Sequence, residues 1–388
     1  MKLLFFIGTR QEAIKLSPLI REMKKYGELF HVKVCISAHD RATLDQILDF
    51  FDIRPDLILD IMTNDENPYY VTTMTMTKIR DVIRLFEPDY LIVQGNTTTV
   101  FAGALAAYYE KVNVAHVEAG IRDFNLSTLY PDGMNGRLIT QIANLHFAPN
   151  LSAKDNLLME AINDNNIFVV GYPGVDSLSL CLDKIRHRSP KEYTSLESID
   201  FNKKIILVMG NRGGTLGESI ENIYPAVKAI AHLDSVEIVY AVDNLQSIRR
   251  SPFRMLSGYS NVHLVSPLDY PSTVYLMSKS YIIITNYFDT AVEAATLGIP
   301  VVMVEAGADS ERRHKEELVK VICADHKNII NEINNLFENR IYYNRMARNM
   351  NAYDDGMVCI RIRQLFSGLY EDNINNKRSK KKGQATSH

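Results

Sequence analysis

Short, almost uninterrupted apolar segments alternate with helical patterns along most of the chain, and this alternation restricts the fold strongly. Continuous apolar strands separated by helices indicate a parallel sheet that is covered on both faces. The first series is Lys2–Ile7, Val32–Ile36, Tyr90–Gln94, Val112–Glu118, His146–Ala148 and Ile167–Val170. A second series is Ile205–Met209, Glu237–Tyr240, His263–Val265, Tyr281–Thr285 and Val301–Val304. The sequence therefore predicts two doubly wound α/β domains.

The chain length fits two domains, because 388 residues are enough for two hydrophobic cores. We assign residues 1–171 to the first domain, 172–203 to a linker with a connecting helix, and 204–355 to the second domain. Residues 356–371 are predicted to form a C-terminal helix, and 372–388 a disordered basic tail. In folds of this kind ligands bind at the carboxyl ends of the strands, so we expect both sheets to face a central cleft.

Composition excludes several classes of protein. The 43 basic and 46 acidic side chains nearly balance, which argues against nucleic acid as a partner. No apolar run approaches the ~20 residues of a membrane span, and the first apolar stretch is too short for a secretory signal, so we expect a cytoplasmic protein without a transmembrane segment. The four cysteines show no CxxC pair, and neither a metal nor a cofactor is expected.

Three longer segments carry a resemblance to a known family. They are IGTRQEAIKLSPLI, VQGNTTTVFAGALAAYYEKVNVAHVEAGIRDFN, and LDYPSTVYLMSKSYIIITN followed by VEAATLGIPVV. Together they resemble the non-hydrolysing UDP-N-acetylglucosamine 2-epimerases, from Met1 to about Leu369. The resemblance implies two Rossmann-like domains of the GT-B type, a homodimer, UDP held mainly by the second domain, and a final helix that packs back on the first.

The resemblance also implies a reaction. Such enzymes eliminate UDP to give a 2-acetamidoglucal and then add UDP back, with protonation on the other face of the sugar. This requires carboxylates near the sugar C2 and a cationic, amide-rich cradle for the departing diphosphate.

Several residues of this chain match the family's site. Arg10 and Lys15 match a cationic pair that meets phosphate at the first strand-to-helix turn. Glu118 matches a catalytic carboxylate, and Asp132 stands where the family usually has a glutamate. Glu293 matches the glutamate that holds the ribose hydroxyls.

Other positions depart from the family. Asn96 stands where an aspartate is a principal acid/base, and an amide cannot exchange a proton at neutral pH. In the turn that follows the second domain's first strand, Asn211 replaces a histidine that contacts the diphosphate, and two glycines follow Arg212.

The segment after Thr285 departs furthest. Tyr287, Phe288 and Asp289 replace a Ser-Gly-Gly turn whose backbone amides bind the β-phosphate. We expect the two rings to fill the phosphate position and the carboxylate to repel it.

The residues by themselves leave other interpretations open. Arg10 and Lys15 fit an exposed helix face, Glu118 and Asp132 fit helix or turn caps, and the two aromatic rings fit a core beside a shifted turn.

Three functional hypotheses remain at this level. We favour a divergent family member that has lost most or all epimerase activity and has a partner or regulatory role in surface polysaccharide biosynthesis, as a homodimer or paired with a complete paralogue. Any binding of a UDP-sugar is then weakened. The alternatives are an active UDP-HexNAc 2-epimerase and a GT-B enzyme with an altered nucleotide-sugar substrate.

Overall fold

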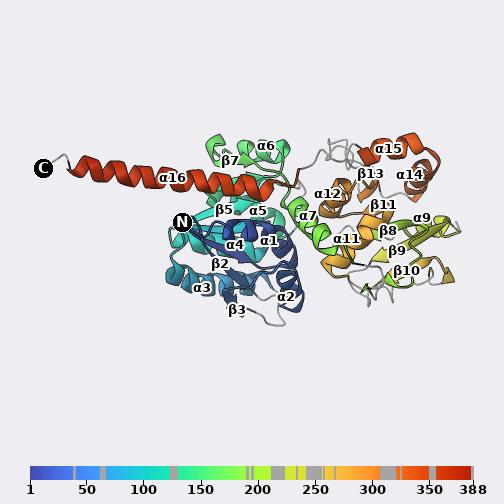
Figure 1. Cartoon of the computed structure of the whole chain (residues 1–388), viewed down its shortest axis with the longest axis horizontal. Helices are drawn as coiled ribbons and strands as arrows, with labels where there is room; N and C mark the ends of the chain where they lie inside the picture. The colour runs from blue at the N-terminus through green and yellow to red at the C-terminus, as the bar shows by residue number, and fades with distance from the viewer. Residues whose placement is uncertain are drawn as a thin grey trace. The chain divides into compact units, whose positions relative to one another are not determined.

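The structure of the chain is a computed structural model, and it divides into two compact units (Figure 1). Unit 1 comprises Met1–Ser177 and Gly356–His388, and unit 2 comprises Leu178–Asp355. The described residues are 1–37, 41–61, 67–122, 130–188, 192–193, 196–210, 223–232, 235–241, 256, 258–265, 268–305, 320–323, 326–348 and 355–385.

Unit 1 is built on a parallel sheet of seven strands in the order β3-β2-β1-β4-β5-β6-β7. The strands are β1 (Lys2–Ile7), β2 (His31–Ser37), β3 (Leu57–Leu59), β4 (Tyr90–Gln94), β5 (Asn113–Val117), β6 (Leu145–Ala148) and β7 (Ile167–Val169). The strand order changes direction between β1 and β4, and open parallel sheets bind ligands at such positions.

Helices cover both faces of this sheet. They are α1 (Arg10–Lys24), α2 (Arg41–Phe50), α3 (Pro68–Phe86), α4 (Thr98–Tyr109), α5 (Asp132–Ile142), α6 (Leu151–Met159) and α16 (Val358–Ala385), with a short 3-10 helix, η1 (Asp164–Asn166). Helix α7 (Pro173–Ile185) begins in unit 1 and continues into unit 2. Leu4 and Phe6 of β1 pack with α3 and α4 in one buried cluster. Phe366 of α16 packs edge-on against Tyr90 and at a tilt against Phe147 of the sheet, and α16 contacts α1. Strand side chains alternate between the faces, so both layers are apolar.

The last helix completes unit 1. The carboxylate of Asp176 accepts the backbone amides of Val358 and Cys359, at 3.3 and 3.0 Å, where α16 begins. Arg363 forms an ion pair with Glu22 of α1 at 3.2 Å. The helix extends to Ala385 and so includes most of the segment 372–388 that the sequence predicts to be a disordered tail.

Unit 2 repeats the architecture with six parallel strands in the order β10-β9-β8-β11-β12-β13. The strands are β8 (Lys204–Met209), β9 (Val236–Ala241), β10 (Val262–Val265), β11 (Ser280–Thr285), β12 (Val301–Glu305) and β13 (Lys320–Cys323). Besides the second part of α7, the described helices of unit 2 are α9 (Ile223–Ile230), α11 (Tyr270–Lys279), α12 (Phe288–Thr296), α14 (His326–Glu338) and α15 (Arg340–Arg348). Ile206, Ile238 and Ile284 form its core with Ile333 of α14. The predicted fold class, two parallel α/β domains, is confirmed.

Within the described ranges, none of the helices combines the length and the hydropathy that a bilayer span requires. Three cysteines, Cys35, Cys181 and Cys359, are buried free thiols, and burial raises the pKa of Cys35 to about 12. Such thiols are poor nucleophiles because little thiolate is present at neutral pH.

Candidate active site

Three turns meet at the carboxyl ends of adjacent strands in unit 1, and they carry three of the site residues predicted from the sequence. The turn after β1 leads into α1 with Arg10, the turn after β4 contains Asn96, and the turn after β5 begins at Glu118. Strands β1, β4 and β5 are neighbours in the sheet. The sheet therefore places these positions at one edge.

Glu118 is a buried carboxylate that accepts from Lys15 and Gln94. Its side chain is held by Lys15, whose Nζ lies 2.7 Å from Oε2, and by Gln94, whose Nε2 lies 2.5 Å from the same oxygen. Glu118 is 6% exposed and Lys15 8%. A buried carboxylate is costly unless it is compensated in this way. The alternative that Lys15 lies on a solvated helix face is therefore wrong.

Glu118 also has an unusual backbone. Its φ is 58°, in the left-handed region that residues other than glycine rarely adopt. Gly120, two residues further on, has φ 85°, and a Cβ on it would lie 2.2 Å from the backbone oxygen of Ala153. The chain is thus turned sharply after β5 and packed against α6, which fixes where the Glu118 side chain leaves the backbone.

Glu12 joins two of the three turns. Its carboxylate accepts the backbone amides of Gly8 and Thr9 at 2.6 and 3.2 Å and the hydroxyl of Thr97 at 2.8 Å. Thr9 and Glu12 form a capping box at the start of α1, and Thr97 caps α4. Burial raises the pKa of Glu12, although these hydrogen bonds oppose the rise. This carboxylate holds together the turns that carry Arg10 and Asn96.

Asn96 lies in the turn after β4, and its side chain is half-buried next to α5. A Cβ on Gly136 would lie 3.4 Å from the Asn96 Cβ and 3.9 Å from both Asn96 Nδ2 and Arg122 Nη1. The preceding carbonyl, of Gly95, accepts the ring N–H of His116 at 2.7 Å. Asn96 therefore lies in a fixed turn against Gly136 of α5, and the guanidinium of Arg122 lies against the same glycine.

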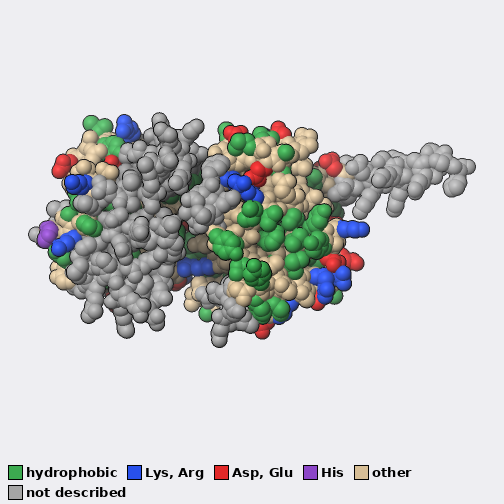
Figure 2. Space-filling view, turned by 180° about the vertical axis from the view of Figure 1, so that it is seen from behind, with side chains coloured by type: hydrophobic (Ala, Val, Ile, Leu, Met, Phe, Trp, Pro, Cys, Tyr) green, Lys and Arg blue, Asp and Glu red, His purple; other side chains and the backbone are tan. Residues whose placement is uncertain are grey.

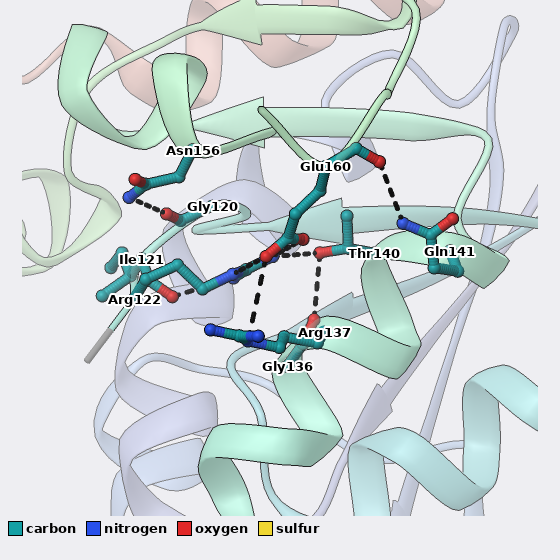
Figure 3. Close-up of polar contacts among 9 residues, drawn as sticks. All are labelled: Gly120, Ile121, Arg122, Gly136, Arg137, Thr140, Gln141, Asn156 and Glu160. Carbon is teal, nitrogen blue, oxygen red and sulfur yellow. Dashed lines mark hydrogen bonds and ion pairs between the residues drawn. The ribbon is translucent and has the colours of Figure 1, made fainter. Parts of the chain in front are cut away.

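That guanidinium belongs to a cluster beside the site (Figure 3). Arg122 donates Nε and Nη2 to the two carboxylate oxygens of Glu160, at 2.9 and 2.8 Å, and Nη2 also reaches Thr140 Oγ1 at 2.7 Å. Arg137 lies 3.9 Å from the same carboxylate. The fork-like pairing with Arg122 lowers the pKa of Glu160. The cluster ties the residues after β5 to α5 and α6.

Asp132 is the first residue of α5 and is half-buried. Burial raises the pKa of its carboxyl group. On the next turn of the helix Asn135 Nδ2 lies 3.4 Å from Thr98 Oγ1 of α4. The start of α5 therefore lies beside the start of α4 and the turn that contains Asn96.

The remaining predicted residues lie in unit 2. Helix α12 begins at Phe288, and Tyr287 at its N-cap makes no capping bond with its side chain. Tyr287 donates its backbone amide to Thr285 Oγ1 at 3.0 Å, and Asp289 lies in the first turn. The side chains of residues 287 to 289 are half-buried.

Glu293, one turn further along α12, accepts the hydroxyl of Tyr270 at 3.1 Å. Asn211 and Arg212 lie outside the described residues.

Two histidines of the first sheet are buried and neutral. Burial lowers the pKa of His116 to about 3 and of His146 to about 4. They pair across β5 and β6. In the described part of the chain no group of three His, Cys, Asp or Glu side chains is placed to hold a metal ion.

Glu12 and Gln94 are two polar residues of this site that the sequence motifs did not identify as functional. The pattern Thr9-x-x-Glu12 is a signal of a capping box, and Gln94 is a polar residue that ends an apolar strand just before Gly95.

Comparison with known proteins identifies the family. The family profile described as UDP-N-acetylglucosamine 2-epimerase matches residues 21–367. The chain belongs to the UDP-N-acetylglucosamine 2-epimerase family. It is 36% identical over 368 residues to the UDP-N-acetylglucosamine 2-epimerase of Campylobacter jejuni, covering 93% of this chain and 96% of the relative. It is 35% identical over 370 residues to that of Escherichia coli K12, covering 93% and 97%.

A solved structure of a UDP-N-acetylglucosamine 2-epimerase agrees with this assignment. The enzyme of Neisseria meningitidis, in its structure bound to UDP-GlcNAc, matches with a TM-score of 0.87 and 35% identity, covering 95% of this chain and 100% of that one. The resemblance drawn from the sequence motifs is therefore confirmed, as is the GT-B class of the fold.

Proposed function

We propose that this chain is a member of the 2-epimerase family with epimerase turnover lost or strongly reduced, acting as a partner or regulator in surface polysaccharide biosynthesis. The observation that carries the proposal is Asn96, a carboxamide in the turn after β4 that lies against Gly136 of α5. Proton transfer at a sugar carbon needs a group that gains and loses a proton, and a carboxamide does neither near neutral pH.

Further support comes from the start of α12. A helix N-terminus attracts phosphate through its free backbone amides, and a carboxylate in the first turn competes for the same field. Asp289 is such a carboxylate, preceded by the rings of Tyr287 and Phe288. We propose that a UDP-sugar, the ligand class of the meningococcal relative, binds this chain with weakened affinity.

An active epimerase is the second candidate, and one observation favours it. Glu118 is buried with Lys15 as its counter-ion. Burial raises the pKa of Asp132, which begins α5 beside the turn that contains Asn96. A compensated carboxylate and a carboxyl group whose pKa burial raises are suited to the roles of base and acid. In that case Glu118 and Asp132 would serve the two faces of the sugar.

We also propose that the chain forms a dimer through unit 1, with a second copy or with a complete paralogue. Helices α3, α4 and α5 lie side by side, and apolar side chains are exposed on α4 and α5: Tyr108, Tyr109, Met134 and Leu138. The two tyrosines are 60% and 64% exposed. Figure 2 shows hydrophobic side chains gathered on unit 1. Such a patch is characteristic of an interaction surface.

The activity experiment measures two events separately. The purified protein is incubated with UDP-GlcNAc in D₂O, and NMR follows both the appearance of UDP-ManNAc and the incorporation of deuterium at C2. We expect neither, because both require a proton-transferring group. Sustained interconversion by protein free of host epimerase would instead establish the second candidate.

Sedimentation of the wild type and of Tyr109→Glu tests the dimer, which the charge should weaken.

A further inference from the structure

We propose that Gln94 is a positioning residue for Glu118, whose carboxylate it orients and holds in the ionised form. The inference concerns a carboxylate that either proposed function would retain, but its test does not require turnover.

The geometry brings Gln94 and Glu118 together from neighbouring strands. Gln94 is the last residue of β4 and pairs with Val117, directly before Glu118. Its Nε2 lies 2.5 Å from Glu118 Oε2, the oxygen that Lys15 reaches at 2.7 Å. One carboxylate oxygen therefore accepts from Gln94 of the sheet and from Lys15 of α1 at the same time.

The direction of the Gln94 amide is fixed by this contact. Rotating the amide by half a turn would bring its oxygen against the carboxylate oxygen of Glu118, and two acceptors repel each other. Nε2 must therefore face Glu118, and Oε1 must point away from it.

The oxygen end of the amide is left unsatisfied. Gln94 is 4% exposed, and its Oε1 is buried without a hydrogen-bond partner among the described residues. A buried acceptor without a donor destabilises the folded state, whereas a methionine of similar shape would avoid this cost. Packing alone therefore does not account for a glutamine here.

The contact with Glu118 does account for it. A hydrogen bond to the charged form of a carboxyl group favours ionisation, and an amide donates it at every pH because it does not titrate. Lys15 compensates the charge, while the amide adds a second fixed direction. Since the backbone of Glu118 is already held at φ 58°, Lys15 and Gln94 both restrict where its carboxylate points.

The test is a titration of Glu118 itself. Protein labelled with ¹³C at glutamate carboxyl carbons is followed by NMR, and the Glu118 signal is assigned by its loss in Glu118→Gln. In Gln94→Met we expect the titration midpoint of Glu118 to rise by about one pH unit, a tenfold change in acidity. The variant loses the unsatisfied oxygen but also one donor to Glu118, so urea denaturation and the NMR spectrum are used to establish that it is folded. The matched control is Gln141→Met, since Gln141 donates instead to the backbone oxygen of Glu160.

Two further variants keep the test decisive. Gln94→Asn retains an amide that is one methylene too short, and it should raise the midpoint as Gln94→Met does. Gln94→Glu should raise it further, because two carboxylates then share the site. An unchanged midpoint in folded Gln94→Met or Gln94→Asn would overturn the proposal, and so would a loss of stability without a shift. The presence or absence of epimerase turnover affects none of these readings.

Discussion

The carboxylate of Asp176 accepts the backbone amide of Cys359 at 3.0 Å, across 183 residues of sequence. Its other oxygen accepts the amide of Val358 at 3.3 Å, so one side chain caps the first turn of α16. The two places where the chain passes between the units, after Ser177 and before Gly356, lie next to these residues in sequence.

This contact predicts that Asp176→Ala lowers the free energy of unfolding by about 1–3 kcal/mol, because two buried backbone amides lose their acceptor. Urea denaturation measures the loss, and hydrogen exchange should show faster exchange at the start of α16. Asp155→Ala, at an exposed position of α6, is the control. Equal stability of the two variants would contradict the assigned role.

The buried histidines predict a pH dependence of stability. The pKa of His146 is lowered to about 4 by burial, so between pH 4 and 6.5 the unfolded chain binds more protons there than the folded chain does. The free energy of unfolding should therefore rise with pH in that window, by up to about 1.4 kcal/mol per pH unit, and this contribution is complete above 6.5. In His146→Gln the slope should be smaller. Parallel profiles of wild type and variant would show that His146 is not buried as a neutral group.

Restoring the carboxylate alone is expected to fail. Asn96→Asp should give no measurable interconversion of UDP-GlcNAc and UDP-ManNAc, because the diphosphate is still poorly held. The same NMR assay measures this. Adding Ser-Gly-Gly at residues 287–289 should raise turnover above that of either change alone. Full activity of the single variant would show instead that Asn96 was the whole defect.

The start of α12 has its own test. Replacing Tyr287, Phe288 and Asp289 with Ser-Gly-Gly should strengthen UDP binding, measured by calorimetry. The gain should shrink as salt rises, because screening weakens the attraction of phosphate. Uridine, which lacks the diphosphate, is the control ligand and should change less. Tight UDP binding by the wild type, without change in the variant, would mean that the aromatic rings lie away from the phosphate position.

Much of the fold follows from the apolar strands. Strands β1 and β4 have the predicted bounds, Lys2–Ile7 and Tyr90–Gln94, because both are long apolar runs bounded by turns. The prediction missed β3, Leu57–Leu59, since three residues between Asp56 and Asp60 give too short a signal. It also missed β13, a four-residue strand at the edge of the second sheet.

The site was predicted only in part, for a different reason. Glu118 and Lys15 were found through motifs, but their direct contact joins residues 103 positions apart. Gln94 meets Glu118 across 24 residues, and Glu12 meets Thr97 across 85. Roles of this kind depend on strand order, which places distant segments side by side and leaves no local pattern in the sequence.

Unit 1 is synthesised in two parts, because the residues of unit 2 lie between its strands and α16 in the sequence. Phe366 is fully buried against Phe147, and α16 is synthesised after every other described helix of both units. All seven strands of unit 1 therefore leave the ribosome, followed by the whole of unit 2, before the helix that covers Phe147 is available. During that interval the side of the nascent unit 1 that Phe366 will cover, at Tyr90 and Phe147, is open to water and to chaperones, so truncated chains that end before α16 should aggregate.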